Sequence, residues 1–89
     1  MSDKPVGMAR SLAGRDKGET YFVLSRGERE VLLADGKHRK LANPKRKNLR
    51  HVSFLPAQGF EAVSDLIGDR PNDAELRRAM AKYKATVSI

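Results

Sequence analysis

The chain has 89 residues, of which 18 are Lys or Arg and 11 are Asp or Glu, so its formal net charge is +7 and its isoelectric point lies near 10.2. This length predicts one small domain, and the lack of cysteine excludes disulfides and thiolate metal sites. No apolar run approaches the length of a membrane span, so we expect a cytoplasmic protein that makes no membrane contact. The excess of positive charge favours a polyanionic partner, and nucleic acid fits best.

The excess charge is confined to the first part of the chain. Residues 1–55 hold 13 basic and 6 acidic side chains, whereas residues 56–89 hold five of each. Between these parts, the sequence Pro-Ala-Gln-Gly at 56–59 has the composition of a linker. We therefore predict a basic β domain over residues 1–55 and a neutral helical extension over residues 56–89.

The first part has the pattern of short strands separated by turns. The β-branched and aromatic run at 20–24 is expected to form a hairpin with the run at 30–34. Asp35-Gly36 follows directly and predicts a type I′ turn, in which both central residues need positive φ. Asn43-Pro44 cannot continue a ladder, so it separates the last two strands. The five predicted strands cover residues 6–12, 20–24, 30–34, 38–41 and 49–55.

Five strands within about 50 residues predict a small closed barrel, because an open sheet of this size would leave its edges exposed. The tail has helical spacing instead. A first helix is predicted from Phe60 to Ile67, ended by Gly68, and a second begins at a cap formed by Asn72 or Asp73. We expect the apolar stripe of the second helix to pack on the barrel, with docking of a partner protein as the alternative. This stripe consists of Leu76, Ala79, Met80 and Tyr83.

The glycine-bounded loop at 14–18, Gly-Arg-Asp-Lys-Gly, lies between two apolar runs, and residues 8–24 thereby resemble a KOW motif. The runs at 33–41 and 43–51 extend the likeness to the bacterial single-domain KOW proteins, which are related to a large-subunit ribosomal protein family. This resemblance covers residues 5–55. It implies an SH3-like five-stranded barrel that binds RNA, in the first place rRNA of the large subunit, with no cofactor and no catalysis.

The residues themselves give RNA binding a physical basis. Seven basic and no acidic side chains lie between Gly36 and Leu55, and arginine can fork onto two phosphate oxygens. The loop at 14–18 can grip a phosphate, although its glycines can equally serve turn geometry and its charges solubility. Asp16 is expected to accept amides of its own loop. The candidate RNA-binding residues are Arg15, Lys17, Lys37, Arg39, Lys40, Lys45, Arg46, Lys47, Arg50 and His51.

Recognition is expected to depend on shape and charge, because aromatic side chains are few. Tyr21 and Phe22 alternate on one strand, so one faces inward and the other offers at best a single stacking surface. Contact with about four to six phosphates of single-stranded or looped RNA predicts a log-log salt slope of roughly −3 to −4, at ~0.7 per phosphate.

Two alternatives to RNA binding follow from the same sequence. The chain could be a protein-interaction module of the transcription or translation machinery that docks a ribosomal or transcription protein through its barrel or tail helices. Catalysis is the weaker alternative, because His38 and His51 have no metal-ligand spacing and no phosphate-binding GK[ST] loop is present. Ser11, Asp35 and His38 lack the flanking motifs of a nucleophile site. We therefore expect no enzymatic activity and no cofactor.

Overall fold

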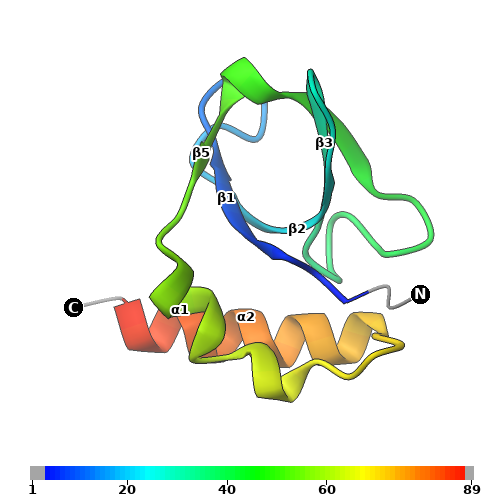
Figure 1. The fold of residues 1–89 in the computed structure, drawn as a ribbon, viewed down its shortest axis with the longest axis vertical. Coiled ribbons are helices and arrows are strands. Elements are labelled where there is room, and N and C mark those ends of the chain that lie inside the picture. The colour runs from blue at the N-terminus through cyan, green and yellow to red at the C-terminus, as the bar shows by residue number, and fades with distance from the viewer. Residues whose placement is uncertain (1–3, 88–89) are drawn as a thin grey trace.

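A computed structural model describes residues 4–87 as a curled sheet with helices along one side (Figure 1). The first three residues of the predicted β domain and the last two of the predicted extension lie outside this range. The elements in chain order are β1 (Gly7–Ser11), β2 (Thr20–Arg26), β3 (Glu30–Ala34), β4 (Lys45–Asn48), the 3-10 helix η1 (Leu49–His51), β5 (Val52–Phe54), α1 (Ala57–Glu61), the 3-10 helix η2 (Ser64–Leu66) and α2 (Asp73–Val87).

The five strands form one antiparallel sheet in the order β4-β3-β2-β1-β5. The sheet curls until β3 and β5 face each other across the interior, and η1 spans the open side (Figure 1). A bulge between Val23 and Ser25 shifts the register of β2 against β3, and such bulges increase the local twist. The structure therefore confirms the predicted mainly β small barrel followed by a C-terminal helix.

Both faces of β2 are buried, which divides the core into two clusters. Tyr21 and Val23 point into the curled interior, whereas Phe22 points to the helices and meets Phe60 of α1 edge to face, with ring centroids 6.3 Å apart. The interior cluster consists of Ala9, Tyr21, Val23, Val31, Leu33 and Val52. The outer cluster joins Met8, Phe22 and Ala34 to Val63, Ile67, Leu76, Ala79, Met80 and Tyr83. The apolar stripe of α2 thus lies against the outer face of the sheet.

The predicted strand at 38–41 is wrong, because side-chain carboxylates capture the amides that a ladder would need. Asp35 accepts from the backbone N–H groups of Lys37 and Arg39, each at 2.9 Å. The amide of Leu41 donates to Asp73 at 2.9 Å, across the boundary between barrel and tail. The segment is consequently a turn, and β4 at 45–48 pairs with β3 instead.

The turn at 35–36 also differs from the predicted type I′ geometry. Gly36 has φ of +79°, but no other residue type among residues 4–87 has positive φ, so Asp35 does not adopt the conformation that type I′ requires. The amides of Asp35 and Gly36 both donate to the carbonyl of Arg39. A wider loop therefore replaces the expected two-residue turn.

Three further boundaries are corrected. The expected strand at 49–55 begins as η1, because the Asn48 side chain accepts from the Arg50 amide and turns the chain before β5. Residues 56–59, expected as a linker, lead directly into α1. The helix expected from Phe60 to Ile67 is divided into α1 and η2, and Ser64 at the break bonds back to the Glu61 carbonyl, a contact that competes with helical hydrogen bonding.

The start of α2 follows the predicted capping chemistry. Asn72 Oδ1 accepts from the Glu75 amide at 2.8 Å, so Asn72 is the cap. The Glu75 carboxylate in turn accepts from the Gly68 amide at 2.9 Å. Asp73, the other candidate cap, is used instead to hold the turn at Leu41.

We predict that Gly36→Ala destabilises the protein more than Gly18→Ala does. Both glycines have positive φ, which costs alanine roughly 1–2 kcal/mol. A Cβ at Gly36 would in addition overlap the Asp73 carbonyl and press on the Leu76 side chain, whereas nothing lies near a Cβ at Gly18. Urea denaturation of the two variants measures the difference. Equal losses of stability would show that the barrel and α2 are not in the close contact described.

Candidate nucleic-acid interface

Asp16, in the loop between β1 and β2, is the centre of a hydrogen-bonded network. Its Oδ1 accepts from Lys47 Nζ at 2.8 Å and from the Ser11 hydroxyl at 2.8 Å. Its Oδ2 accepts from the Tyr21 hydroxyl at 2.9 Å and lies 3.3 Å from Lys45 Nζ. Lys47 Nζ also donates to the Ala13 carbonyl at 2.8 Å. Two lysines of β4 therefore hold the loop in place.

The network fixes the charge of Asp16. Burial alone would raise the pKa of this carboxyl, but hydrogen bonds from Lys47, Ser11, Tyr21 and Lys45 outweigh burial and hold the pKa well below its ordinary value. Burial, and then the hydrogen bond to the Asp16 carboxylate, raise the pKa of Tyr21. The carboxylate is thus ionised and the phenol neutral across the physiological range.

Lys47 belongs to the interior rather than to the exposed cationic surface on which the sequence analysis placed it. Only 9% of its side chain is exposed, and its ammonium is neutralised by Asp16. The alternation of β4 explains this, because Lys45 and Lys47 share one side of the strand and Arg46 takes the other. Arg46 is 69% exposed and lies 3.9 Å from Glu30, a distance at which a surface ion pair contributes little.

Asp16 also differs from its expected role. No hydrogen bond joins its carboxylate to an amide of its own loop among residues 4–87; its recorded donors are side chains from β1, β2 and β4. The loop turns by backbone bonds instead, from the Lys17 amide to the Gly14 carbonyl and from the Glu19 amide to the Asp16 carbonyl. The carboxylate is left free to anchor the loop to the sheet.

A first open hollow gathers three of the predicted RNA-binding residues. Its volume is about 290 Å³, just below the range of roughly 300–1,000 Å³ in which proteins enclose small molecules. Arg15 is exposed, Arg39 is half-buried, and the structure gives neither guanidinium an ion-pair partner within the described range. We call this space the loop hollow. It is lined by Arg15, Asp16, Glu19, Tyr21, His38, Arg39 and Lys45.

The remaining predicted residues are not all collected there. Lys17 and Lys40 are exposed and are sequence neighbours of residues that line the loop hollow, but neither of them lines it. Arg50 lines a different hollow, with Arg29 and Asn48, at the η1 end of the barrel. His51 is exposed, and its carbonyl accepts from the Leu12 amide. The cations therefore form more than one surface.

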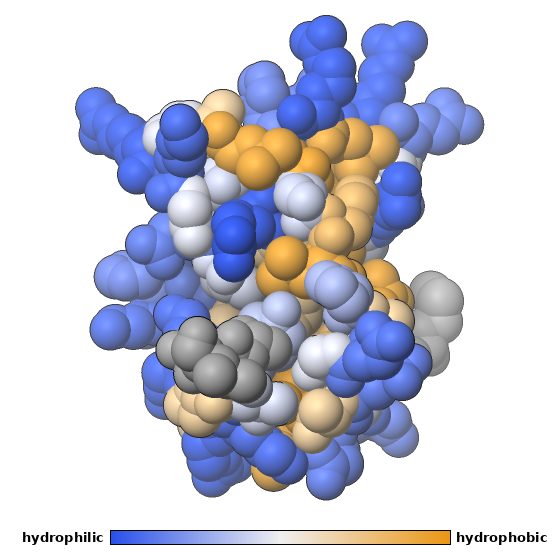
Figure 2. Space-filling model, turned by 90° about the vertical axis from the view of Figure 1, so that its left-hand side faces the viewer, coloured by the Kyte–Doolittle hydropathy of each residue, from blue (hydrophilic) through white to orange (hydrophobic). Residues whose placement is uncertain are grey.

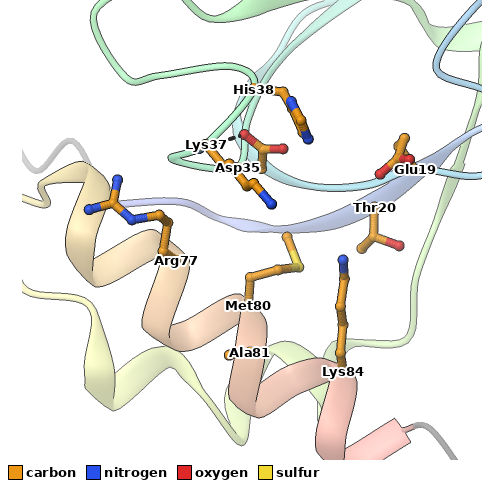
Figure 3. Close-up of a pocket in the computed structure, with 9 residues that line it drawn as sticks. All are labelled: Glu19, Thr20, Asp35, Lys37, His38, Arg77, Met80, Ala81 and Lys84. Atoms are coloured by element: carbon orange, nitrogen blue, oxygen red, sulfur yellow. Dashed lines mark hydrogen bonds between the residues drawn. The ribbon is translucent and has the colours of Figure 1, made fainter.

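A second hollow, of about 280 Å³, lies between the turn at 35–38 and α2 (Figure 3). The side chains of Lys37, His38 and Lys84 point into it, and Met80 forms its floor (Figure 3). We call this space the helix hollow. It is lined by Glu19, Thr20, Asp35, Lys37, His38, Arg77, Met80, Ala81 and Lys84.

The residues that α2 and the end of the loop contribute to these hollows were not among the predicted site residues. Arg77 and Lys84 are seven positions apart and so share one flank of the helix, a spacing that is visible in the sequence. Glu19 lines both hollows. Its position could not be inferred from the sequence, because it depends on how the loop and the turn approach each other.

Neither aromatic residue of β2 is available for stacking. Tyr21 and Phe22 are 3% and 0% exposed, so the expectation that one of them offers a stacking surface is wrong. The β2 strand is covered on both faces, which leaves no outward position for an aromatic ring there. Phe54 is 39% exposed, but the Arg26 guanidinium lies 4.3 Å from its ring centroid.

The face that contains β1 and β5 is apolar instead of cationic at its middle. Figure 2 shows a band of hydrophobic side chains across this face, surrounded by hydrophilic ones. Val6 is 67% exposed, and with Phe54 and Phe60 it lines a shallow groove between the sheet and α1. This groove contains no member of the predicted RNA-binding set.

Comparison with models of known protein families gave no match, and comparison with curated proteins found no relative of this chain. The resemblance to KOW proteins therefore stays a prediction. Within residues 4–87, no helix is both long enough and apolar enough to cross a bilayer. The same part of the chain gathers no three His, Asp or Glu side chains in a metal-binding arrangement.

We predict that Lys47→Met lowers the free energy of unfolding by about 3 kcal/mol, because it removes the shorter of the two ion pairs that compensate the largely buried Asp16 carboxylate. Arg46→Met, at the neighbouring but exposed position, should change it by less than about 1 kcal/mol. Urea denaturation measures both variants. If Lys47→Met is as stable as the wild type, the network does not hold the loop.

Acid should unfold the protein partly through Asp16. Its folded-state pKa lies below the unfolded value of about 3.9, so its contribution to stability is present above about pH 4 and is lost as the pH falls further. Asp16→Asn removes that contribution, so its free energy of unfolding should fall less steeply between about pH 5 and pH 2.

The control for this acid titration is Asp65→Asn, which removes an exposed carboxylate outside the network. Denaturant titrations across the pH range should give this control the wild-type slope. The same slope for Asp16→Asn would mean that the hydrogen bonds to Asp16 do not perturb its titration.

Proposed function

We propose that this chain is an RNA-binding protein of the ribosome that holds rRNA by its phosphates. The observation that carries the proposal is the arrangement of Arg15 and Arg39 around the loop hollow, both without an ion-pair partner in the described part of the chain. Guanidinium groups suit phosphate, because they fork onto two oxygens. The resemblance of residues 5–55 to single-domain KOW proteins supports ribosomal RNA as the ligand.

The anchored loop supports the proposal on energetic grounds. Asp16 is held by Lys45 and Lys47, so the loop that presents Arg15 is ordered before any ligand arrives. A preordered loop loses less conformational entropy on binding than a free one. Two lysines and one carboxylate of the network therefore position the neighbouring Arg15.

The burial of both aromatic rings of β2 favours contact with the RNA backbone over stacking on unpaired bases. Tyr21 lines the loop hollow, but its ring is 3% exposed and its hydroxyl is used by Asp16. Backbone contact reads shape and charge, as double-stranded or folded RNA allows. We infer that the ligand is structured RNA rather than an extended single strand.

A second candidate function is docking of a protein through the apolar groove beside β5 and α1. The observation that favours it is that Val6 and Phe54 are both exposed and line the same groove. Adjacent exposed apolar side chains are typical of protein interaction sites. The two functions can coexist, because the groove and the loop hollow share no lining residue.

We predict that Arg15→Glu weakens binding to a ribosomal RNA fragment at least about tenfold and makes the salt dependence shallower. With Lys47 withdrawn into the interior, about four phosphate contacts on structured RNA give a log-log slope of roughly −3.5, at the duplex value of ~0.9 per contact, and the variant should lose about one contact. Filter binding across a salt series measures both quantities. Arg78→Glu, on an exposed position of α2 outside both hollows, makes the same charge change as a control.

A flat salt dependence of the wild type, or equal losses in Arg15→Glu and Arg78→Glu, would contradict the proposed interface. Sedimentation of a cell lysate then separates the two candidate functions. Migration with the large ribosomal subunit at low salt, lost at high salt, supports rRNA binding. Migration with RNA polymerase supports docking of a protein.

A further inference from the structure

We propose that the RNA backbone crosses from the loop hollow into the helix hollow, so that α2 forms the second wall of one phosphate path and Glu19, in its middle, limits the affinity. This inference rests on the proposed function and extends its site onto the tail. The predicted RNA-binding residues end at His51, whereas the path would include Lys84.

The two hollows are adjacent. Both are lined by Glu19 and His38, so a ligand that leaves one enters the other at these side chains. Arg15 and Arg39 lie on the loop side of that junction, and Lys37 and Lys84 lie on the helix side (Figure 3). The arrangement is an open trough with cations at both ends, which suits a chain of phosphates better than one compact ligand.

The charged side chains along the trough differ in whether other protein groups already engage them. Asp16 is occupied by four side-chain donors, and Asp35 accepts two backbone amides. No ion pair or hydrogen bond engages the side chains of Lys37 and Lys84 within residues 4–87. Glu19 is exposed and lines both hollows, and its carboxylate likewise has no side-chain partner in the described range, so a phosphate in the trough would meet its charge uncompensated.

The two walls are fixed relative to each other. Arg77 Nη1 donates to the Gly36 carbonyl at 2.7 Å, which ties α2 to the turn that carries Lys37. The bond from the Leu41 amide to Asp73 makes a second tie at the start of the same helix. These two bonds hold the first half of α2 against the turn, so that Lys84 faces the turn across the helix hollow.

The first test compares two lysines of α2 that differ in their relation to the trough. Lys84 lines the helix hollow, whereas Lys82 is exposed on another side of the same helix. Binding of the ribosomal RNA fragment to Lys84→Glu should be about five- to tenfold weaker than to Lys82→Glu, and its salt slope shallower by about 0.9. Equal affinities and slopes for the two variants would overturn the proposal.

The second test asks for a gain of affinity, which a misfolded variant cannot produce. Glu19→Gln keeps the side-chain volume and removes the repulsion, so it should bind the same RNA about three- to fivefold more tightly at low salt. Glu61→Gln removes a charge from α1, outside both hollows, and should leave the affinity near that of the wild type. Unchanged or weaker binding by Glu19→Gln would overturn the assignment of Glu19 to the path.

The outcomes separate this inference from the function on which it rests. One outcome is that the wild type binds RNA, Arg15→Glu binds it more weakly, and Lys84→Glu and Lys82→Glu bind it equally. The loop hollow would then remain the binding site, and α2 would lie outside the interface. A wild type without affinity for the RNA fragment overturns both proposals.

Discussion

The ion pair between Asp16 and Lys47 joins parts of the barrel that the sheet itself leaves apart. In the order β4-β3-β2-β1-β5, two strands separate β4 from β1, yet Lys47 of β4 reaches the loop that follows β1. A small β domain has little apolar core with which to fix its loops, and here a buried charge pair with four side-chain donors fixes one of them. This contact, together with the backbone bonds of the loop, holds the segment that carries Arg15 and Lys17.

Burial of this pair separates the structural charges of the chain from those that can meet a ligand. A group that is desolvated and neutralised inside the protein has no net attraction to offer a phosphate. In the basic run at 45–47, Lys47 therefore stabilises the fold, and Arg46 is exposed on the surface. Lys45 is partly exposed and also contacts Asp16. The exposed charges that surround the two hollows come from the loop, the turn and α2.

The sequence predicted those elements whose signals are local. The strands β1, β2 and β3 follow from short apolar runs bounded by turn residues, and the start of α2 follows from a cap expected at Asn72 or Asp73. The strand expected at 38–41 failed because the amide of Leu41 is captured by Asp73, 32 residues away, which no local pattern records. The inward position of Lys47 depends on the register of β4 against β3, and that register was likewise invisible before pairing was known.

The double-sided burial of β2 has a consequence for how such a barrel can be reused. Phe22 and Met8 face outward from the sheet and are covered by α2, while Gly36 lies so close to the Asp73 carbonyl that no larger residue fits. A fusion protein that contained the strands without the tail would expose the apolar outer face of the sheet to solvent. The unit that can be transplanted is therefore the strands together with α2, or together with another amphipathic segment that covers the same face.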